Sequence, residues 1–196
     1  MCGAQVVSTA IIAPLGALAV VANAFAVTAE SICYMPGYGI ANAAAALVGR
    51  SVGAGDMESA KRDGNICIAL GAFLMTCTGA VMMLICPLVF RMLTPVSDVQ
   101  QLAARVLRIE LLAEPLFGAS IVAAGALRGA GDTLVPSLLN LGSIWLVRVG
   151  SALVLVRRFG LTGMWIAMAV ELCIRGLLLL YRQKTSKYYA QSITRP

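Results

Sequence analysis

Two glutamates stand one helical turn apart in an apolar stretch of the chain. Glu110 and Glu114 lie near the start of residues 108–135, which read RIELLAEPLFGASIVAAGALRGAGDTLV. Residues four positions apart share one face of a helix. An ionisable group inside a membrane-spanning helix is costly to bury and usually faces the bundle interior or a wet cavity. A carboxylate in such a cavity can hold a proton, a metal cation or an organic cation, but not all three at once.

A helix over residues 108–128 would position both acids. It would be about 30 Å long, which matches the hydrocarbon core of a bilayer. Pro115 follows Glu114 directly and cannot donate a backbone hydrogen bond, so we expect a kink or a local break beside this acid. A purely structural interpretation stays open for each acid: Glu110 would lie at the headgroups, and Glu114 would hydrogen-bond to a neighbouring helix.

Glu30 is a third acid in an apolar setting, because it is the one charged residue between Gln5 and Gly49. Forty-five residues of helix would be about 68 Å long, more than twice a bilayer, so this region must hold two passes. We expect Glu30, like Glu110 and Glu114, to bind a cation or a charged substrate. The alternative for Glu30 is a hydrogen bond between helices.

Proline and glycine predict two hinges beside these acids. Pro36, Gly37 and Gly39 weaken the helix that carries Glu30, and Pro115 does the same in the later helix. The small residues at 40–46 would let another helix approach closely.

The composition indicates an integral membrane protein. Of the 196 residues, 60% are hydrophobic and only 12% are charged, whereas a soluble domain normally carries about 25% charged residues. Much of the net charge of +6 lies in short segments between or after the apolar runs, where basic residues report topology and contact anionic headgroups. The sequence lacks the basic patches with clustered aromatics that nucleic-acid binding needs.

Catalytic and metal-binding motifs are not evident in the sequence. It has no histidine, and its six cysteines stand without C-x-x-C spacing, so a zinc site is not expected. A metal-dependent phosphotransferase would need clustered carboxylates or histidines, and the sequence has no D-x-x-D pair. We therefore expect no enzyme activity, no cofactor, and no metal site beyond a cation held by the buried acids.

The apolar runs predict an all-α, polytopic membrane helix bundle. One transmembrane lobe is expected over residues 1–190, with a basic cytoplasmic tail over residues 182–196. Its helices are expected near residues 1–14, 19–48, 65–91, 107–128, 134–156 and 163–181. The first helix is too short to cross a bilayer, so we expect its beginning to be truncated, with the break at residues 14–17.

The basic residues outside the spans predict the orientation. One side holds eight of them: Arg50, Lys61, Arg62, Arg128, Arg182, Lys184, Lys187 and Arg195. The opposite side holds five: Arg91, Arg105, Arg108, Arg157 and Arg158. The larger set is expected in the cytoplasm with the C-terminus. The three acids named above then fall in the outer half of the membrane, where they could meet in one outward-opening cavity.

Other polar residues predict helix caps and a buried ion pair. Asp56 is expected to cap a short interfacial helix before the third span, and residues 97–98 supply a second turn and cap. Arg148 and Glu171 are expected at similar depth on antiparallel helices, so Glu171 pairs either with Arg148 or, at i+4, with Arg175. Either pair would be structural charge neutralisation.

The tetrapeptide Gly-Ala-Gly-Asp occurs twice, at residues 53–56 and 129–132, and each copy follows a helix rich in small residues. A repeated unit of this kind is typical of transporters built from structural repeats. With the stretches MPGYGIANAAAALVGRSVGAGDMESAKR, AEPLFGASIVAAGALRGAGDTLVPSLL and GLTGMWIAMAVELCIRGLLLLYR, nearly the whole chain resembles the C-terminal half of a multidrug and toxic compound extrusion (MATE) transporter.

The resemblance implies a fold of two six-helix lobes that exports cationic or amphipathic drugs in exchange for Na⁺ or H⁺ across the plasma (inner) membrane. It places Glu30 and Glu114 where family members use acids for cation coupling and substrate charge. It also gives turn-forming and gating roles to the loop motifs, which hold Gly53, Gly55, Arg128, Gly129, Gly131 and Asp132. The expected partners are small organic cations or amphipathic drugs, the lipid bilayer and an N-terminal lobe that is missing from this chain.

Two further functions stay open. A lipid-linked sugar flippase of similar fold would need a cationic cavity for diphosphate, whereas the residues predicted to line the cavity here are acids. The composition also allows an inactive fragment, or a half-sized subunit that needs a partner lobe, and the short first helix favours this interpretation.

Overall fold

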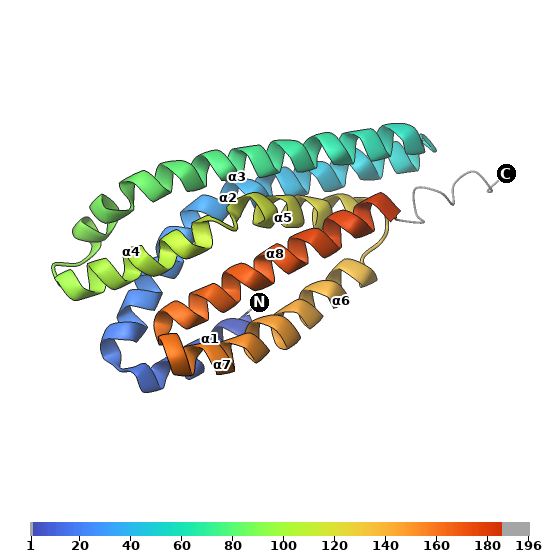
Figure 1. Cartoon of the computed structure of the whole chain (residues 1–196). Coiled ribbons are helices and arrows are strands. Elements are labelled where there is room, and N and C mark those ends of the chain that lie inside the picture. The colour runs from blue at the N-terminus through green and yellow to red at the C-terminus, as the bar shows by residue number, and fades with distance from the viewer. Residues whose placement is uncertain (1, 186–196) are drawn as a thin grey trace.

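The protein is described by a computed structural model that covers residues 2–185, with side chains from residue 6 onward. The described residues form helices and no strand (Figure 1). The elements are α1 (Cys2–Ile12), the 3₁₀ turn η1 (Ala13–Leu15), α2 (Ala17–Gly53), α3 (Met57–Leu93), α4 (Ser97–Leu111), α5 (Glu114–Gly129), α6 (Leu134–Gly142), the π-helical segment η2 (Ser143–Val149), α7 (Gly150–Phe159) and α8 (Leu161–Thr185).

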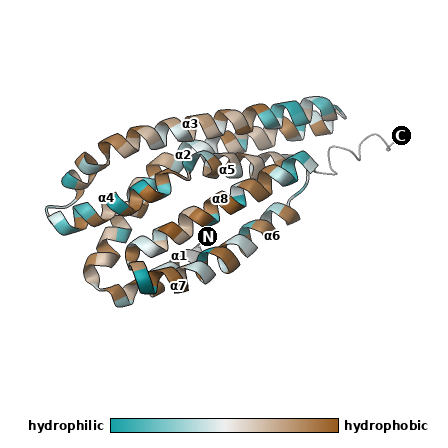
Figure 2. Ribbon diagram, viewed as in Figure 1, coloured by the Kyte–Doolittle hydropathy of each residue, from teal (hydrophilic) through white to brown (hydrophobic). Residues whose placement is uncertain are grey.

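The outer surface of the bundle is apolar. Four stretches are long and apolar enough to cross a membrane: α2, α3, the continuous helix Leu134–Phe159, and α8. Figure 2 shows hydrophobic residues along the middle of these helices and hydrophilic residues at the end where α2 meets α3. Large side chains on the outside are strongly exposed, including Leu84 at 81% and Leu146 at 78%. Such a surface belongs in lipid, and the predicted all-α membrane bundle is confirmed.

The predicted break after the first helix is confirmed. The 3₁₀ turn ends at Gly16, whose φ of 97° lies in the left-handed region that glycine adopts without a Cβ penalty. Figure 1 shows α1 folded back beside α7, with the turn into α2 at the end of the bundle opposite the C-terminus.

The cap at Asp56 is confirmed, but the short interfacial helix after it is wrong. The Asp56 side chain accepts a hydrogen bond of 3.0 Å from the Ser59 N–H, and α3 then continues without interruption to Leu93. The second predicted cap is also wrong, because Val96 precedes α4 and makes no side-chain capping bond. Thr94 supports that turn instead, since its Oγ1 accepts from the Val96 N–H at 3.3 Å.

The single helix predicted over residues 107–128 is two helices. α4 ends at Leu111 and α5 begins at Glu114, so the local break predicted beside Glu114 is confirmed. Pro115 has no N–H to donate back to Leu111, and proline is favoured in the first turn of a helix for that reason. The Ala113 N–H closes the join by donating to the Glu110 carbonyl at 2.7 Å.

The last two predicted spans are longer than expected. The helix placed at residues 134–156 continues to Phe159 and contains the π segment η2. Gly160, with a φ of 56°, alone separates it from α8. Since α8 extends to Thr185, the first part of the predicted tail is helical, and the remainder of that tail lies outside the described residues.

Helices α2 and α5 pack closely against each other in the core. A Cβ added at Gly125 would lie 3.0 Å from the Ala41 Cα, and one at Gly129 would lie 2.9 Å from the Ala45 Cα. The two helices therefore run parallel in a register offset by 84 residues. Small residues allow this approach, so the packing face predicted at residues 40–46 meets α5.

Candidate functional site

The three acids predicted to bind cations are all buried in the bundle. Glu30 on α2 is 8% exposed, while Glu110 at the end of α4 and Glu114 at the start of α5 are 0% exposed. Both carboxylate oxygens of Glu110 and both of Glu114 lack a hydrogen-bond partner among the described residues. A buried ionised carboxylate without a partner is very costly, so these two acids have free capacity for a proton or a cation.

The packing of α2 against α5 brings two of these acids to one level. Continued along both helices, the 84-residue offset between Ala41 and Gly125 corresponds to Glu30 beside Glu114, and these two acids interact electrostatically. Glu110 interacts electrostatically with both of them. Helix α3 closes the other side, because Gly79 packs against the Glu114 side chain, with the glycine Cβ position 3.2 Å from Cγ.

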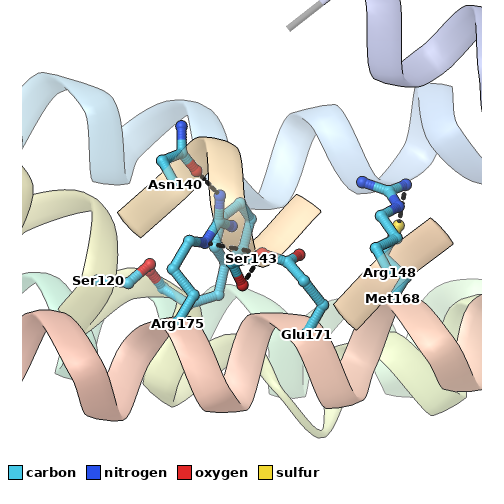
Figure 3. Close-up of polar contacts among 8 residues, drawn as sticks. Ser120, Asn140, Ser143, Arg148, Met168, Glu171 and Arg175 are labelled. Atoms are coloured by element: carbon cyan, nitrogen blue, oxygen red, sulfur yellow. Dashed lines mark hydrogen bonds and ion pairs between the residues drawn. The ribbon is translucent and has the colours of Figure 1, made fainter. Parts of the chain in front are cut away.

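Arg148 on the π segment η2 is the basic residue that faces this group of acids. It interacts electrostatically with Glu30 and Glu110. It forms no ion pair within residues 6–185, and its guanidinium contacts the Met168 sulfur at 2.7 Å (Figure 3). The alternative in which Glu171 pairs with Arg148 is therefore not the one observed.

Glu171 and Arg175 form the buried ion pair that was the second alternative. The Arg175 Nε lies 3.3 Å from the Glu171 Oε1, and the Ser143 hydroxyl donates to the same oxygen at 2.9 Å. The Arg175 guanidinium also donates to the Asn140 side-chain oxygen. Figure 3 shows these groups converging from α6, η2 and α8, so the pair joins the last two spans.

Aromatic rings connect this ion pair to α2. The Arg175 guanidinium lies 5.4 Å from the centre of the Phe117 ring, within cation–π range. Phe117 meets Tyr34 edge to face at 6.0 Å, and Tyr34 meets Tyr38 at 5.7 Å.

A cavity of about 140 Å³ opens beside these rings, between α2, α5, α6 and α8. Its lining residues are Tyr38, Phe117, Ser120, Ile121, Ala124, Arg128, Pro136, Ser137, Asn140, Arg175 and Leu179. The cavity combines aromatic surface with a few polar groups, which is the kind of lining found in small-molecule pockets.

The predicted hinge residues lie in different settings. α2 stays helical through Pro36, and Gly37 is buried where a Cβ would press on Met75. A Cβ at Gly39 would meet nothing within 4 Å. Pro115 stands in the first turn of α5. Whether α2 bends at Pro36 during function stays a prediction.

The two Gly-Ala-Gly-Asp copies form the same backbone turn. The Asp56 N–H donates to the Ser51 carbonyl at 3.0 Å, and the Asp132 N–H donates to the Leu127 carbonyl at 2.9 Å. The preceding glycines have positive φ: 76° at Gly55 and 92° at Gly131. This is the Schellman arrangement of a helix C-terminus, and it explains why glycine is required at both positions.

The aspartates that end the two copies have different roles. Asp56 is exposed and caps α3, whereas Asp132 is 1% exposed and forms an ion pair of 2.7 Å with Arg182 on α8. The other motif residues support packing and the cavity. Gly129 packs on α2, Gly53 is the exposed last residue of α2, and the Arg128 side chain lines the cavity.

Within the described residues, no group of three or more acids, cysteines or histidines lies close enough to hold a metal ion. Na⁺ at Glu30 or Glu114 would therefore need carbonyl or water oxygens in addition to carboxylates.

Comparison with known families identifies the chain. A family model described as MatE matches residues 1–154. The chain belongs to the MatE family. The resemblance seen in the glycine-rich motifs is thereby confirmed, and a transporter family, not an enzyme family, accounts for the chain.

Relatives and solved structures of MatE proteins agree with this assignment. The chain is 32% identical over 175 residues to a "Probable multidrug resistance protein NorM" of Brucella suis, covering 86% of the chain and 37% of that protein. It is also 32% identical to the protein of the same name from Deinococcus radiodurans, over 92% of the chain and 43% of that protein. The Vibrio cholerae MATE transporter VcmN in its bent form superposes with a TM-score of 0.87 at 15% identity, over 96% of the chain and 43% of VcmN. The chain thus spans less than half the length of these proteins.

Several polar residues in and around the candidate site were not predicted from the sequence. Asn140 and Ser143 stand three residues apart in an apolar helix, a spacing that could have indicated a polar face. Asn23 accepts a hydrogen bond of 3.1 Å from the indole N–H of buried Trp165, which ties α2 to α8. The position of Asn23 as a lone asparagine in an apolar run could have indicated a hydrogen bond between helices.

Proposed function

We propose that this chain is one lobe of a MatE transporter that exports small organic cations or amphipathic drugs in exchange for protons or Na⁺. The observation that supports it most is the pair of fully buried acids, Glu110 and Glu114, whose four carboxylate oxygens have no hydrogen-bond partner among the described residues. Buried side-chain oxygens are usually hydrogen-bonded, so two acids with no partner on either oxygen support a role in binding.

Exchange follows from competition for these carboxylates. A cationic drug and a coupling ion cannot both neutralise the same acid, so the arrival of one favours the release of the other. Coupled transport also requires that the acids face one side of the membrane at a time. We propose that the break at Pro115, next to Glu114, and the Pro36 region of α2 permit this change.

The chain contributes the half of the pathway that carries these acids, and an N-terminal lobe contributes the other half. We place the protein in the plasma (inner) membrane with its C-terminus in the cytoplasm. The excess of basic residues around the α2–α3 turn, the α5–α6 turn and the end of α8 supports this orientation, and Figure 1 shows these three regions at one end of the bundle.

A vesicle transport assay tests the proposal. The chain would be joined to an N-terminal lobe of a relative, and efflux of a fluorescent cationic drug would be driven by a proton gradient or by a Na⁺ gradient. Glu114→Gln should abolish efflux and leave membrane insertion intact. Glu58→Gln on the exposed first turn of α3 is the matched control and should transport normally. Unchanged efflux in Glu114→Gln would remove this acid from the coupling site.

A lipid-linked sugar flippase is the second candidate, because Arg128 and Arg175 both line the cavity. A diphosphate needs cations that are free to bind it, and Arg175 is already held by Glu171 and Asn140. The geometry therefore favours the drug exporter. Transport of a lipid-linked oligosaccharide, with no efflux of the cationic drug, would reverse that preference.

A further inference from the structure

A basic groove lies between the end of α3 and the exposed face of α4, away from the acids and the cavity described above. It encloses about 510 Å³ and is lined by Pro87, Arg91, Gln100, Gln101, Ala104, Arg105 and Arg108. No acidic side chain is among these residues. Its charge therefore suits an anion.

The arginines of this groove are free to bind a ligand. Arg91, Arg105 and Arg108 form no ion pair and no hydrogen bond among residues 6–185. Arg105 and Arg108, with Gln101, repeat at helical spacing and are exposed, while the opposite face of α4 is buried. Guanidinium groups donate in a planar fork that matches phosphate oxygens.

The groove runs from the level of the lipid headgroups into the outer part of the apolar layer. The apolar part of α3, residues 66–90, is about 36 Å long, slightly more than the hydrocarbon core of a bilayer. Arg91 follows it immediately, in the last turn of α3. The groove therefore starts at the interface, where α3 ends and α4 begins, at the end of the bundle opposite the C-terminus (Figure 1). The Ala104 carbonyl lies beside the Cys86 thiol of α3, so Arg105 and Arg108 lie deeper than Arg91 and reach the headgroups by extending their long side chains along the surface.

The surface next to the groove suits acyl chains. Leu84, Leu88 and Met92 are spaced four residues apart on α3 and are exposed by 81%, 60% and 82%. Figure 2 shows hydrophobic turns of α3 beside hydrophilic turns of α4. A ligand that combines a phosphate with an apolar tail satisfies both surfaces, whereas a free phosphate uses only the arginines.

We propose that this groove binds the headgroup of an anionic phospholipid, with its phosphate on Arg91, Arg105 and Arg108 and its acyl chains along the exposed stripe of α3. The bound lipid would hold the α3–α4 junction at a fixed depth in the membrane. The site is independent of the proposed transport of drugs, because none of its residues lies in the acidic group or in the cavity.

Native mass spectrometry of the full chain in detergent tests this site. Dioleoyl phosphatidylglycerol, dioleoyl phosphatidylcholine and inorganic phosphate would be titrated separately. We expect phosphatidylglycerol to bind most tightly. The double variant Arg105→Gln with Arg108→Gln should weaken the binding of phosphatidylglycerol about 25-fold, because each arginine lost should weaken it about fivefold.

Two further double variants serve as controls. Arg157→Gln with Arg158→Gln removes the same charge from the exposed end of α7, at the same end of the bundle, and should change binding less than twofold. Arg105→Lys with Arg108→Lys keeps the charge but not the planar fork, so it should bind phosphatidylglycerol more tightly than the glutamine pair and less tightly than the unchanged chain, which separates loss of the site from loss of the fold. The proposal would be overturned if the two double glutamine variants lost the same amount of phosphatidylglycerol affinity. It would also be overturned if the two lipids bound equally well, or if inorganic phosphate bound and phosphatidylglycerol did not.

Discussion

Replacing Gly125 with alanine tests whether the close approach of α2 and α5 holds the bundle together. The added methyl group would lie 2.9 Å from the Ala41 carbonyl carbon and 3.0 Å from its Cα. Both are backbone atoms, so α2 cannot yield by rotating a side chain. Overpacking of this kind costs about 1–3 kcal/mol. Alanine also favours the helix over glycine by about 0.5–1 kcal/mol, which offsets part of that cost.

Gly142→Ala is the matched control for this substitution. Gly142 also has helical backbone, with φ of −61°, and a Cβ there would meet nothing within 4 Å. The free energy of unfolding of this variant should therefore be higher by about 0.5–1 kcal/mol. The two variants should then differ by about 1–3 kcal/mol, which corresponds to roughly 2–12 °C in melting temperature for a chain of this size.

Thermal unfolding in detergent can be followed with a dye that reacts with thiols. Cys33, Cys67 and Cys86 are buried and become accessible on unfolding, while exposed Cys77 gives a constant baseline. If Gly125→Ala melted at the same temperature as Gly142→Ala, the close contact between α2 and α5, and with it the alignment of Glu30 with Glu114, would be refuted.

Three smaller predictions concern charged groups. Arg175→Met should lower the free energy of unfolding by about 3–5 kcal/mol, because it leaves the buried carboxylate of Glu171 without its cation. Adding Glu171→Gln to this variant should recover most of that loss, and chemical denaturation measures both changes. Asp132→Asn should cost about 1.5–3 kcal/mol by removing a charged hydrogen bond to α8, seen as a lower melting temperature. Hydrogen bonds with Ser59 lower the pKa of Asp56. The cap should therefore stabilise α3 at every pH above the ordinary aspartate pKa, and this stabilisation should be lost only as the pH falls below that value. Hydrogen exchange in the first turn of α3 should show this loss at acid pH, and Asp56→Asn should not show it.

Local chemistry made some elements predictable from sequence. Pro115 removes a backbone donor whatever surrounds it, so the break beside Glu114 follows from one residue. The same holds for Gly16 and for the cap at Asp56, because positive φ and side-chain acceptors act over a few residues. Burial of Glu30 and Glu114 was also expected, since an acid in a long apolar run must face the bundle interior.

Other features depended on tertiary packing and were not predictable. The switch from polar residues to an apolar run in α3 suggested two helices, but the backbone hydrogen bonds continue through it. The π segment η2 holds no proline or glycine, although Gly142 and Gly150 flank it. Arg148 lies on this segment, and Arg175 is the arginine that reaches Glu171. The chain positions alone left that choice open.

The oxygens of Glu110 and Glu114, which have no partner in the described part of the chain, have a thermodynamic consequence for the folded chain. An ion that settles between them binds the native bundle and not the unfolded chain, so mass action makes it a folding ligand. At a free concentration one hundred times its Kd, it would add about 2.7 kcal/mol to the free energy of unfolding. The melting temperature then reads out which ion the acids select, without any transport being measured.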